Sequence, residues 1–180
     1  GFDAQVRARI AQLVADGHST RSFGDPGLED AALYEIREQF ARYSDDHAAD
    51  AHQWHLANAL IPDEVIAQLA QLGVFGLTVP EQWGGLGLGK TAMCVVTEEL
   101  SRGYIGLGSL GTRSEIAAEL IRENGTAAQR DQILPGLASG EILPTASFTE
   151  PDVGSDLASL KTRAELITRA DGSQIGRAHV

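Results

Sequence analysis

The residues best suited to chemistry form a run near the end of the chain, Phe148 to Asp156, with the sequence Phe-Thr-Glu-Pro-Asp-Val-Gly-Ser-Asp. Thr149 supplies a hydroxyl, and glycine at 154 lets another group approach the backbone closely. Successive N–H groups around Gly154 and Ser155 can form a nest for an anion. Such a loop suits a pyrophosphate or the polar edge of a planar ring. Its three acidic side chains oppose a site built on charge, so backbone donors would have to dominate. Taken alone, the run is described better as a structural turn than as a ligand loop.

Two other motifs carry weaker chemical signals. The glycine-rich run 81–89 lacks the G-x-x-x-x-G-K-[ST] spacing of a phosphate loop, so we interpret it as a tight turn that needs positive φ. Glu98 and Glu99 are adjacent on a predicted helix and point about 100° apart, so they cannot share one proton. We expect one of them to be packed or paired and the other solvated.

The histidines and the cysteine favour no metal site. His47, His52 and His55 have spacings that converge poorly on a helix, and a solvated helical face explains them better. Cys94 is the single cysteine, so the chain has no internal disulfide and no cysteine-based metal cluster. We interpret it as an inert residue within a helix. A reducing, cytoplasmic setting fits this usage.

Composition excludes several function classes. The 180 residues carry 14 Lys+Arg against 25 Asp+Glu, a net charge of 14 − 25 = −11. That charge repels a phosphate backbone, so nucleic acid is not an expected partner. No apolar run is long enough to span a bilayer, so no membrane segment is expected. Trp54 and Trp83 are interpreted as packing residues.

Apolar spacing predicts helices over most of the chain. One is expected at 4–15, and a second begins at Asp25-Pro26, with residues 44–55 either continuing it or forming a helical insert. Further helices are expected from Pro62 to Gly73, over 90–102, over 107–124 with Ile116, Leu120 and Ile121 buried, and from a Thr126–Gln129 capping box to about 138.

The pattern then changes to that of strands. Residues 142–149 and 164–169 have strand composition, and Asp171-Gly172 signals a hairpin. We therefore predict an N-terminal extension at 1–24, a helical domain at 25–141 and the beginning of a β domain at 142–174. Residues 175–180 can be encoded by a string that looks like a common sequencing-adapter sequence. We expect them to be a non-native tail and exclude them from functional argument.

A set of ordered motifs resembles the acyl-CoA dehydrogenase family. The motifs run from Leu72 to Glu81, through Gly84–Leu88 and Glu98–Gly103, to Asn124–Thr126, Gln129-Arg130, Leu134–Glu141, Thr149–Pro151 and Gly154–Asp156. Their order and spacing hold from about Leu28 to Gln174. Each motif is weak alone, and together they are specific.

The resemblance implies an N-terminal helical domain followed by the start of a β-barrel-like middle domain, with the C-terminal helical bundle absent. It implies non-covalent FAD and α,β-dehydrogenation of an acyl-CoA thioester, in a homo-oligomer with electron-transfer flavoprotein as electron acceptor. The base of most members is a glutamate in the later helical domain. No carboxylate here is assigned that role, and the chain alone is expected to be inactive.

The resemblance also implies roles for residues of the 148–156 run. Phe148 and Thr149 would lie against the flavin, with Thr149 hydrogen-bonded to its polar edge. Gly154 and Ser155 would contact the FAD pyrophosphate, and Ser155 also the pantetheine of CoA.

The segment Ser101–Ile121 carries a narrower resemblance, to a subgroup that has an N-terminal extension and acts on a short branched acyl-CoA with a second carboxylate. A desolvated carboxylate needs a cation or a donor. We assign Arg113 as its partner, with Thr112 and Ser114 as donors; a solvated or helix-capping Arg113 fits equally well. The alternatives are a general short- or branched-chain acyl-CoA dehydrogenase and, in another class, a non-catalytic helical interaction module.

Overall fold

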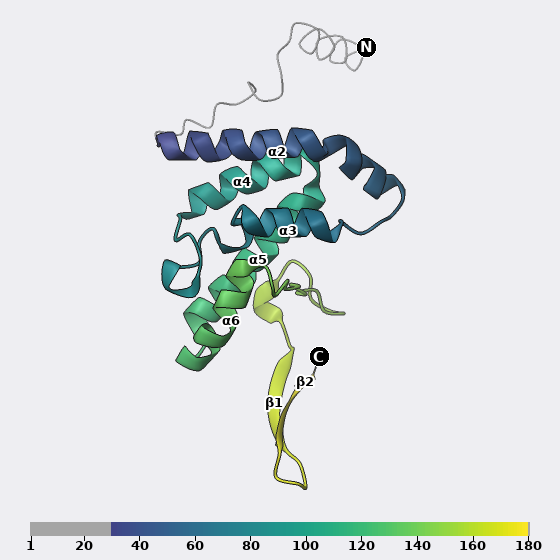
Figure 1. Cartoon of the computed structure of the whole chain (residues 1–180). Coiled ribbons are helices and arrows are strands. Elements are labelled where there is room, and N and C mark those ends of the chain that lie inside the picture. The colour runs from purple at the N-terminus through teal and green to yellow at the C-terminus, as the bar shows by residue number, and fades with distance from the viewer. Residues whose placement is uncertain (1–29, 180) are drawn as a thin grey trace, which may run out of the picture. The chain divides into compact units, whose positions relative to one another are not determined.

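The computed structural model describes residues 30–179 (Figure 1). The expected extension at 1–24, the helix at 4–15 and the helix start at Asp25-Pro26 lie outside these residues. The described elements are α2 (Ala31–Leu56), α3 (Asp63–Gln71), η2 (Val74–Gly76), η3 (Glu81–Trp83), α4 (Lys90–Gly103), α5 (Ile105–Asn124), α6 (Ala127–Ser139), η4 (Leu157–Ser159), β1 (Arg163–Thr168) and β2 (Gln174–His179). The mainly α fold with a small β element at its end is the predicted class.

The described residues form two compact units, 30–62 with 88–109 and 63–87 with 110–179. The first unit is built on α2 and α4, which pack along each other (Figure 1). The Asp30 side chain caps α2 by accepting a hydrogen bond from the Ala32 N–H at 2.9 Å. Residues 44–55 continue α2, the first of the two predicted alternatives. A Cβ atom on Gly103 would lie 2.3 Å from Ser44 Oγ, so glycine permits the close approach of the two helices.

A buried carboxylate joins these helices. Glu99 is 3% exposed and its two oxygens accept from Arg37 Nε at 2.9 Å and Arg102 Nε at 3.0 Å. Arg102 also donates to the Ala41 carbonyl at 3.1 Å and pairs with Asp45 at 2.7 Å. Glu98 is exposed. The prediction of one paired and one solvated glutamate is confirmed.

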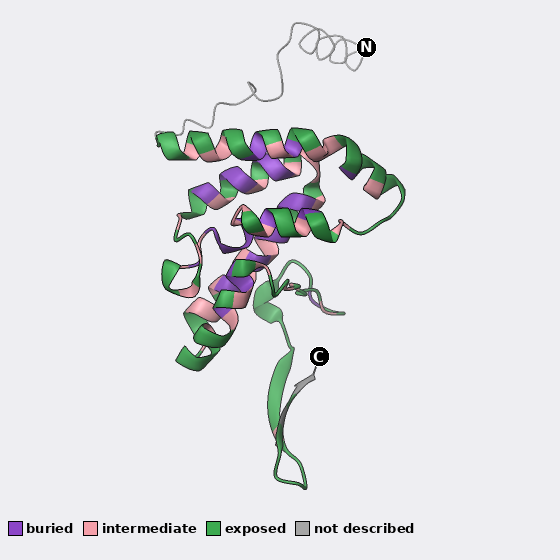
Figure 2. Cartoon of the chain, in the orientation of Figure 1, coloured by how far each residue is buried: buried purple, intermediate pink, exposed green. Residues whose placement is uncertain are grey.

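The second unit has its core between the Val79 segment, α5 and α6. The buried cluster contains Val79, Ala118, Leu134, Leu137 and Ala138, against which Trp83, Ala117, Ile121 and Ile133 pack (Figure 2). Pro62 precedes α3, and Thr126 and Gln129 form the predicted capping box of α6. Gly140 ends α6 at φ 77°, where a Cβ would lie 2.5 Å from Phe75 Cδ2. These helix boundaries follow the sequence prediction.

The predicted buried face of α5 is wrong. Leu120 is 54% exposed, and Ile116 and Ile121 are only partly buried. The buried positions are instead Leu107, Gly108, Leu110, Gly111, Ser114 and Ala118, and four of these six residues are small. Small residues let the core elements approach α5 closely. Leu120 lies exposed on the other side of the helix, whereas the partly buried Ile121 still packs against the core cluster.

The glycine-rich run forms the predicted tight turn. Gly84 and Gly87 have φ of 83° and 62°, which glycine adopts without steric cost. At Gly85 a Cβ would lie 2.0 Å from the Val79 carbonyl oxygen. The backbone angles of the turn and the close approach of Val79 therefore account for glycine at positions 84, 85 and 87.

The expected strand over 142–149 does not form; the segment has no regular structure. Strand composition indicates an ability to pair, but a strand also needs a partner, and no described segment pairs with this one. The second expected strand is β1, which pairs antiparallel with β2 through a turn at Asp171-Gly172, Gly172 having φ of 82°. Backbone pairing in β2 includes residues 175–179, whose non-native origin stays a prediction.

Candidate functional site

The run 148–156 lies on the surface of the second unit. Phe148 is 40% exposed, and Thr149, Gly154 and Ser155 are exposed. A Cβ on Gly154 would meet no atom of the chain within 4 Å. Packing within the described residues therefore does not require glycine there, and the space over its Cα is open to a ligand. The hydroxyls and the open backbone fit the phosphate-binding role predicted for this loop.

The acidic side chains of the loop each have a partner. The Glu150 carboxylate accepts hydrogen bonds from the backbone N–H groups of Lys161 and Thr162, both at 2.8 Å, and from the Thr162 hydroxyl. Asp156 accepts from the Ser159 hydroxyl, and Asp152 lies 3.6 Å from the Lys161 ammonium. Within the described part of the chain, Glu150 and Asp156 therefore bond to neutral donors, and Asp152 is the one of the three that pairs with a cation.

Hydrogen bonding also changes the acidity of Glu150. The Thr162 hydroxyl, then the Lys161 N–H, stabilise the ionised carboxylate and hold the pKa of Glu150 below its ordinary value of 4.5. A lowered folded-state pKa means that these bonds persist at neutral pH and are lost as the pH falls through that pKa. Sequence reasoning missed this role, because Lys161 is 11 residues away and no periodic pattern links it to Glu150.

A second feature is a cavity that both Arg113 and Phe148 line. The cavity has a volume of about 220 Å³ and is lined by α5 residues and by the extended segment 144–148. Its lining consists of Arg113, Ile116, Ala117, Leu120, Pro144, Thr145, Ala146, Ser147 and Phe148. Thr112 and Ser114 are not in this lining, and Ser114 is fully buried. Ile116 and Leu120, which the sequence pattern predicted for the core, thus line this cavity together with Arg113.

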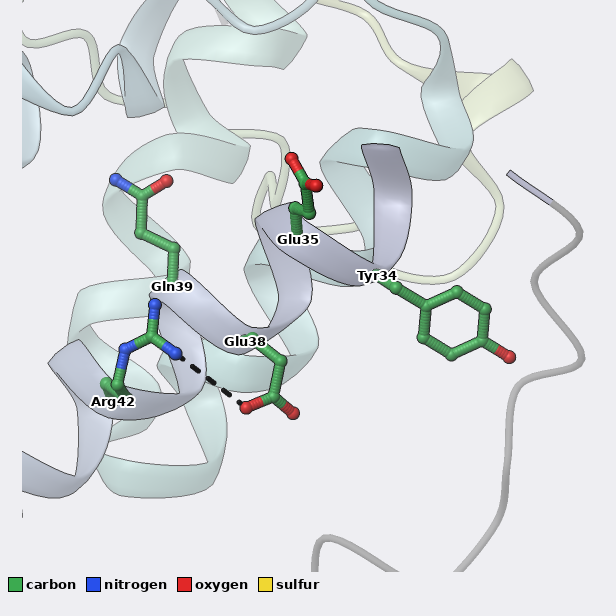
Figure 3. A pocket seen from close by; sticks show the side chains of 5 residues that line it. All are labelled: Tyr34, Glu35, Glu38, Gln39 and Arg42. Carbon is green, nitrogen blue, oxygen red and sulfur yellow. Dashed lines mark ion pairs between the residues drawn. The ribbon is translucent and has the colours of Figure 1, made fainter. Parts of the chain in front are cut away.

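Another hollow has no predicted site residue among its described lining residues. Figure 3 shows one along α2, lined among the described residues by Tyr34, Glu35, Glu38, Gln39 and Arg42, with a Glu38–Arg42 ion pair at 3.8 Å. All five side chains come from this one helix, so the hollow is an exposed helical face. Within residues 30–179, no group of three His, Cys, Asp or Glu side chains could hold a metal ion. His47 instead stacks on Tyr43, with ring centroids 4.1 Å apart.

The remaining single residues lie as follows. Trp83 donates from Nε1 to Asp131 at 2.9 Å, and Trp54 meets Tyr104 edge-on, so both tryptophans have packing roles. Cys94 is exposed on α4. None of the described helices is long and apolar enough to cross a membrane.

Comparison with known proteins gives the family. A model of the acyl-CoA dehydrogenase N-terminal domain matches residues 31–141. The chain belongs to the acyl-CoA dehydrogenase family. It is 61% identical over 165 residues to (2S)-methylsuccinyl-CoA dehydrogenase of Cereibacter sphaeroides, a match that covers 91% of this chain and 30% of that protein. It is 34% identical over 152 residues to mitochondrial isovaleryl-CoA dehydrogenase of Arabidopsis thaliana, covering 82% of this chain and 36% of the relative.

The solved structures agree with the family. A glutaryl-CoA dehydrogenase from Mycobacterium smegmatis in complex with FADH2 superposes with a TM-score of 0.70 at 26% identity, covering 79% of this chain and 37% of that one. The chain thus spans about a third of the length of the proteins it matches.

Proposed function

We propose that this chain is part of an FAD-dependent acyl-CoA dehydrogenase that converts (2S)-methylsuccinyl-CoA to mesaconyl-CoA. The 61% identity to a methylsuccinyl-CoA dehydrogenase over 91% of the chain carries the proposal. This reaction belongs to the ethylmalonyl-CoA pathway. The base that removes the α-proton lies outside this chain, so the residues here bind and orient.

The loop 148–156 fits FAD. Phe148 and Thr149 would lie against the isoalloxazine ring, with Thr149 donating to its polar edge. Gly154 and Ser155 would bind the pyrophosphate through backbone N–H groups, and Ser155 would also contact the pantetheine of CoA. The open space over Gly154 supports this assignment. When bound, the flavin accepts the β-hydride at N5.

The cavity beside Arg113 would hold the acyl group. Its volume of about 220 Å³ is large enough for a short branched acyl chain. Ile116, Ala117 and Leu120 would contact the methyl and methylene groups, while Arg113 binds the distal carboxylate. Thr112, the preceding residue on α5, was also predicted as a donor, but it does not line this cavity, so the assignment rests on Arg113.

Replacement of Arg113 tests the substrate. In the full-length protein, Arg113→Ala should lower kcat/KM for (2S)-methylsuccinyl-CoA by roughly 10- to 100-fold, the worth of a charge-assisted pair. The value for butyryl-CoA, which has no second carboxylate, should change little. Arg122→Gln is the control, because Arg122 is equally a cation of α5 but does not line the cavity. If Arg113→Ala keeps the preference for methylsuccinyl-CoA over butyryl-CoA, the assignment of Arg113 is wrong.

A general short- or branched-chain dehydrogenase is the second candidate, favoured by the 34% identity to isovaleryl-CoA dehydrogenase. That enzyme would turn over isovaleryl-CoA at least as well as methylsuccinyl-CoA. We further propose a cytoplasmic homo-oligomer that transfers electrons to an electron-transfer flavoprotein. The single cysteine supports a cytoplasmic location. Membership of the acyl-CoA dehydrogenase family supports the homo-oligomer and the electron-transfer flavoprotein as acceptor.

A further inference from the structure

We propose that Glu150 is a positioning residue that holds the whole FAD- and CoA-binding loop in its binding conformation. The inference rests on the function proposed above. We call the contacts of the Glu150 carboxylate with Lys161 and Thr162 the Glu150 clamp.

The geometry uses both oxygens of the carboxylate. Oε2 accepts from the Lys161 N–H at 2.8 Å, and Oε1 accepts from the Thr162 N–H at 2.8 Å and from the Thr162 hydroxyl. The clamp therefore ties the start of the loop to the residues just before β1, which begins at Arg163. Charge-assisted hydrogen bonds of this kind are stronger than neutral ones.

Two inner contacts fix the segment between the ends of the clamp. Glu150 and Val153 exchange backbone hydrogen bonds at 2.9 Å and 3.2 Å, and Val153 is buried. Asp156 bonds the Ser159 hydroxyl within the turn that contains η4. Gly154 and Ser155 thus lie between two held points, at Val153 and Asp156.

The position of Glu150 in the chain explains why one side chain can serve both ligand groups. It directly follows Phe148 and Thr149, the proposed flavin contacts, and it precedes Gly154 and Ser155, the proposed pyrophosphate contacts. Fixing Glu150 therefore fixes both pairs together. The carboxylate itself faces Lys161 and Thr162, so it acts through the loop and not on a ligand.

Charges around the clamp favour the same arrangement. The Lys161 ammonium is the cation near Glu150, and it lies 3.6 Å from Asp152, whose side chain is 80% exposed. Asp152 offers a matched control because it is a carboxylate of the same loop outside the clamp.

The test uses the full-length protein with three substitutions. Glu150→Gln puts an amide NH₂ where one oxygen now accepts from a backbone N–H, so the clamp opens. Thr162→Val removes only the hydroxyl donor, whereas Thr162→Ser retains it. Asp152→Asn is the control. The measurements are FAD affinity of the reconstituted apoprotein, kcat and KM, and hydrogen exchange of the Lys161 and Thr162 amides.

We expect Glu150→Gln to bind FAD about tenfold more weakly and to speed exchange of both amides about tenfold. KM for the acyl-CoA should rise, while kcat at saturating FAD and substrate stays within about twofold, because Glu150 touches no reacting atom. Thr162→Val should also weaken FAD binding and speed amide exchange, but by less than Glu150→Gln. Thr162→Ser and Asp152→Asn should resemble wild type in both measurements. A merely structural role would lower thermal stability without this split between KM and kcat.

Two results would overturn the inference. Unchanged amide exchange in Glu150→Gln would mean that the clamp does not exist. Faster exchange with unchanged FAD affinity would mean that the clamp does not position the loop. If the wild-type protein binds no FAD, the proposed function fails, and the exchange data still decide separately whether the clamp forms.

Discussion

The buried Glu99 should contribute strongly to the stability of the first unit. Its side chain is 4% exposed and bonds two arginines, Arg37 and Arg102, whose side chains are 14% and 25% exposed. Glu99→Gln leaves one acceptor oxygen and no charge, so both guanidinium groups lose their ion pair with residue 99 in a partly dry site. Removing one member of a buried ion pair costs about 3–5 kcal/mol. Because both arginines retain some water, we expect about 3 kcal/mol.

Urea unfolding monitored by Trp54 is the suitable assay. Trp54 lies at the end of α2 against Tyr104, within the first unit, and the other tryptophan, Trp83, lies in the second. In the 180-residue chain, a Trp83→Phe background therefore leaves Trp54, in the first unit, as the reporting tryptophan. With an m-value of about 2 kcal/mol/M, the midpoint should fall by roughly 1.5 M. Glu98→Gln, at the exposed neighbouring position, should shift it by less than about 0.3 M. A Glu99→Gln midpoint equal to that of Glu98→Gln would refute the reasoning.

Three further predictions concern single residues. Gly140→Ala should lower the unfolding free energy of the second unit by at least about 2 kcal/mol in thermal unfolding, because φ is 77° and the new Cβ would meet Phe75. Gly154→Ala, where a Cβ would meet no atom within 4 Å, should change that free energy by less than about 0.5 kcal/mol. Thr126→Ala removes the capping box of α6 and should cost about 1 kcal/mol by urea titration; no change would mean that the cap contributes nothing. Burial raises the pKa of Tyr43 above its ordinary value of 10.0. The contribution of the neutral phenol to the free energy of unfolding is therefore fully present below pH 10, and it is lost as the pH rises through the raised pKa. Tyr43→Phe should lose less stability between pH 9 and 12 than wild type, and equal losses would contradict this.

Local signals predicted the ends of elements well. Pro62, the Thr126–Gln129 box, Gly140 and Asp171-Gly172 act on backbone groups a few residues away, and each produced the expected boundary. Interactions between distant residues could not be predicted in this way. Arg37 and Glu99 are 62 positions apart, so the sequence showed that one glutamate is paired but not its partners.

The errors have a physical cause as well. On α5 both the stripe with Leu110, Ser114 and Ala118 and the stripe with Ile116 and Leu120 contain apolar residues. Which stripe of α5 is buried depends on how closely the core elements approach its small side chains. A single sequence does not show that distance. The strand expected over 142–149 failed because pairing depends on a partner segment. The loop 148–156 was identified as a candidate site, but the partners of its carboxylates were not.

Flavin reduction in the full-length protein tests the central claim most directly. The purified protein should show the absorption band of oxidised FAD, and anaerobic (2S)-methylsuccinyl-CoA should bleach that band much faster than an equal concentration of isovaleryl-CoA or butyryl-CoA. A protein without a flavin band, or one whose flavin is bleached fastest by isovaleryl-CoA, would contradict the proposed reaction.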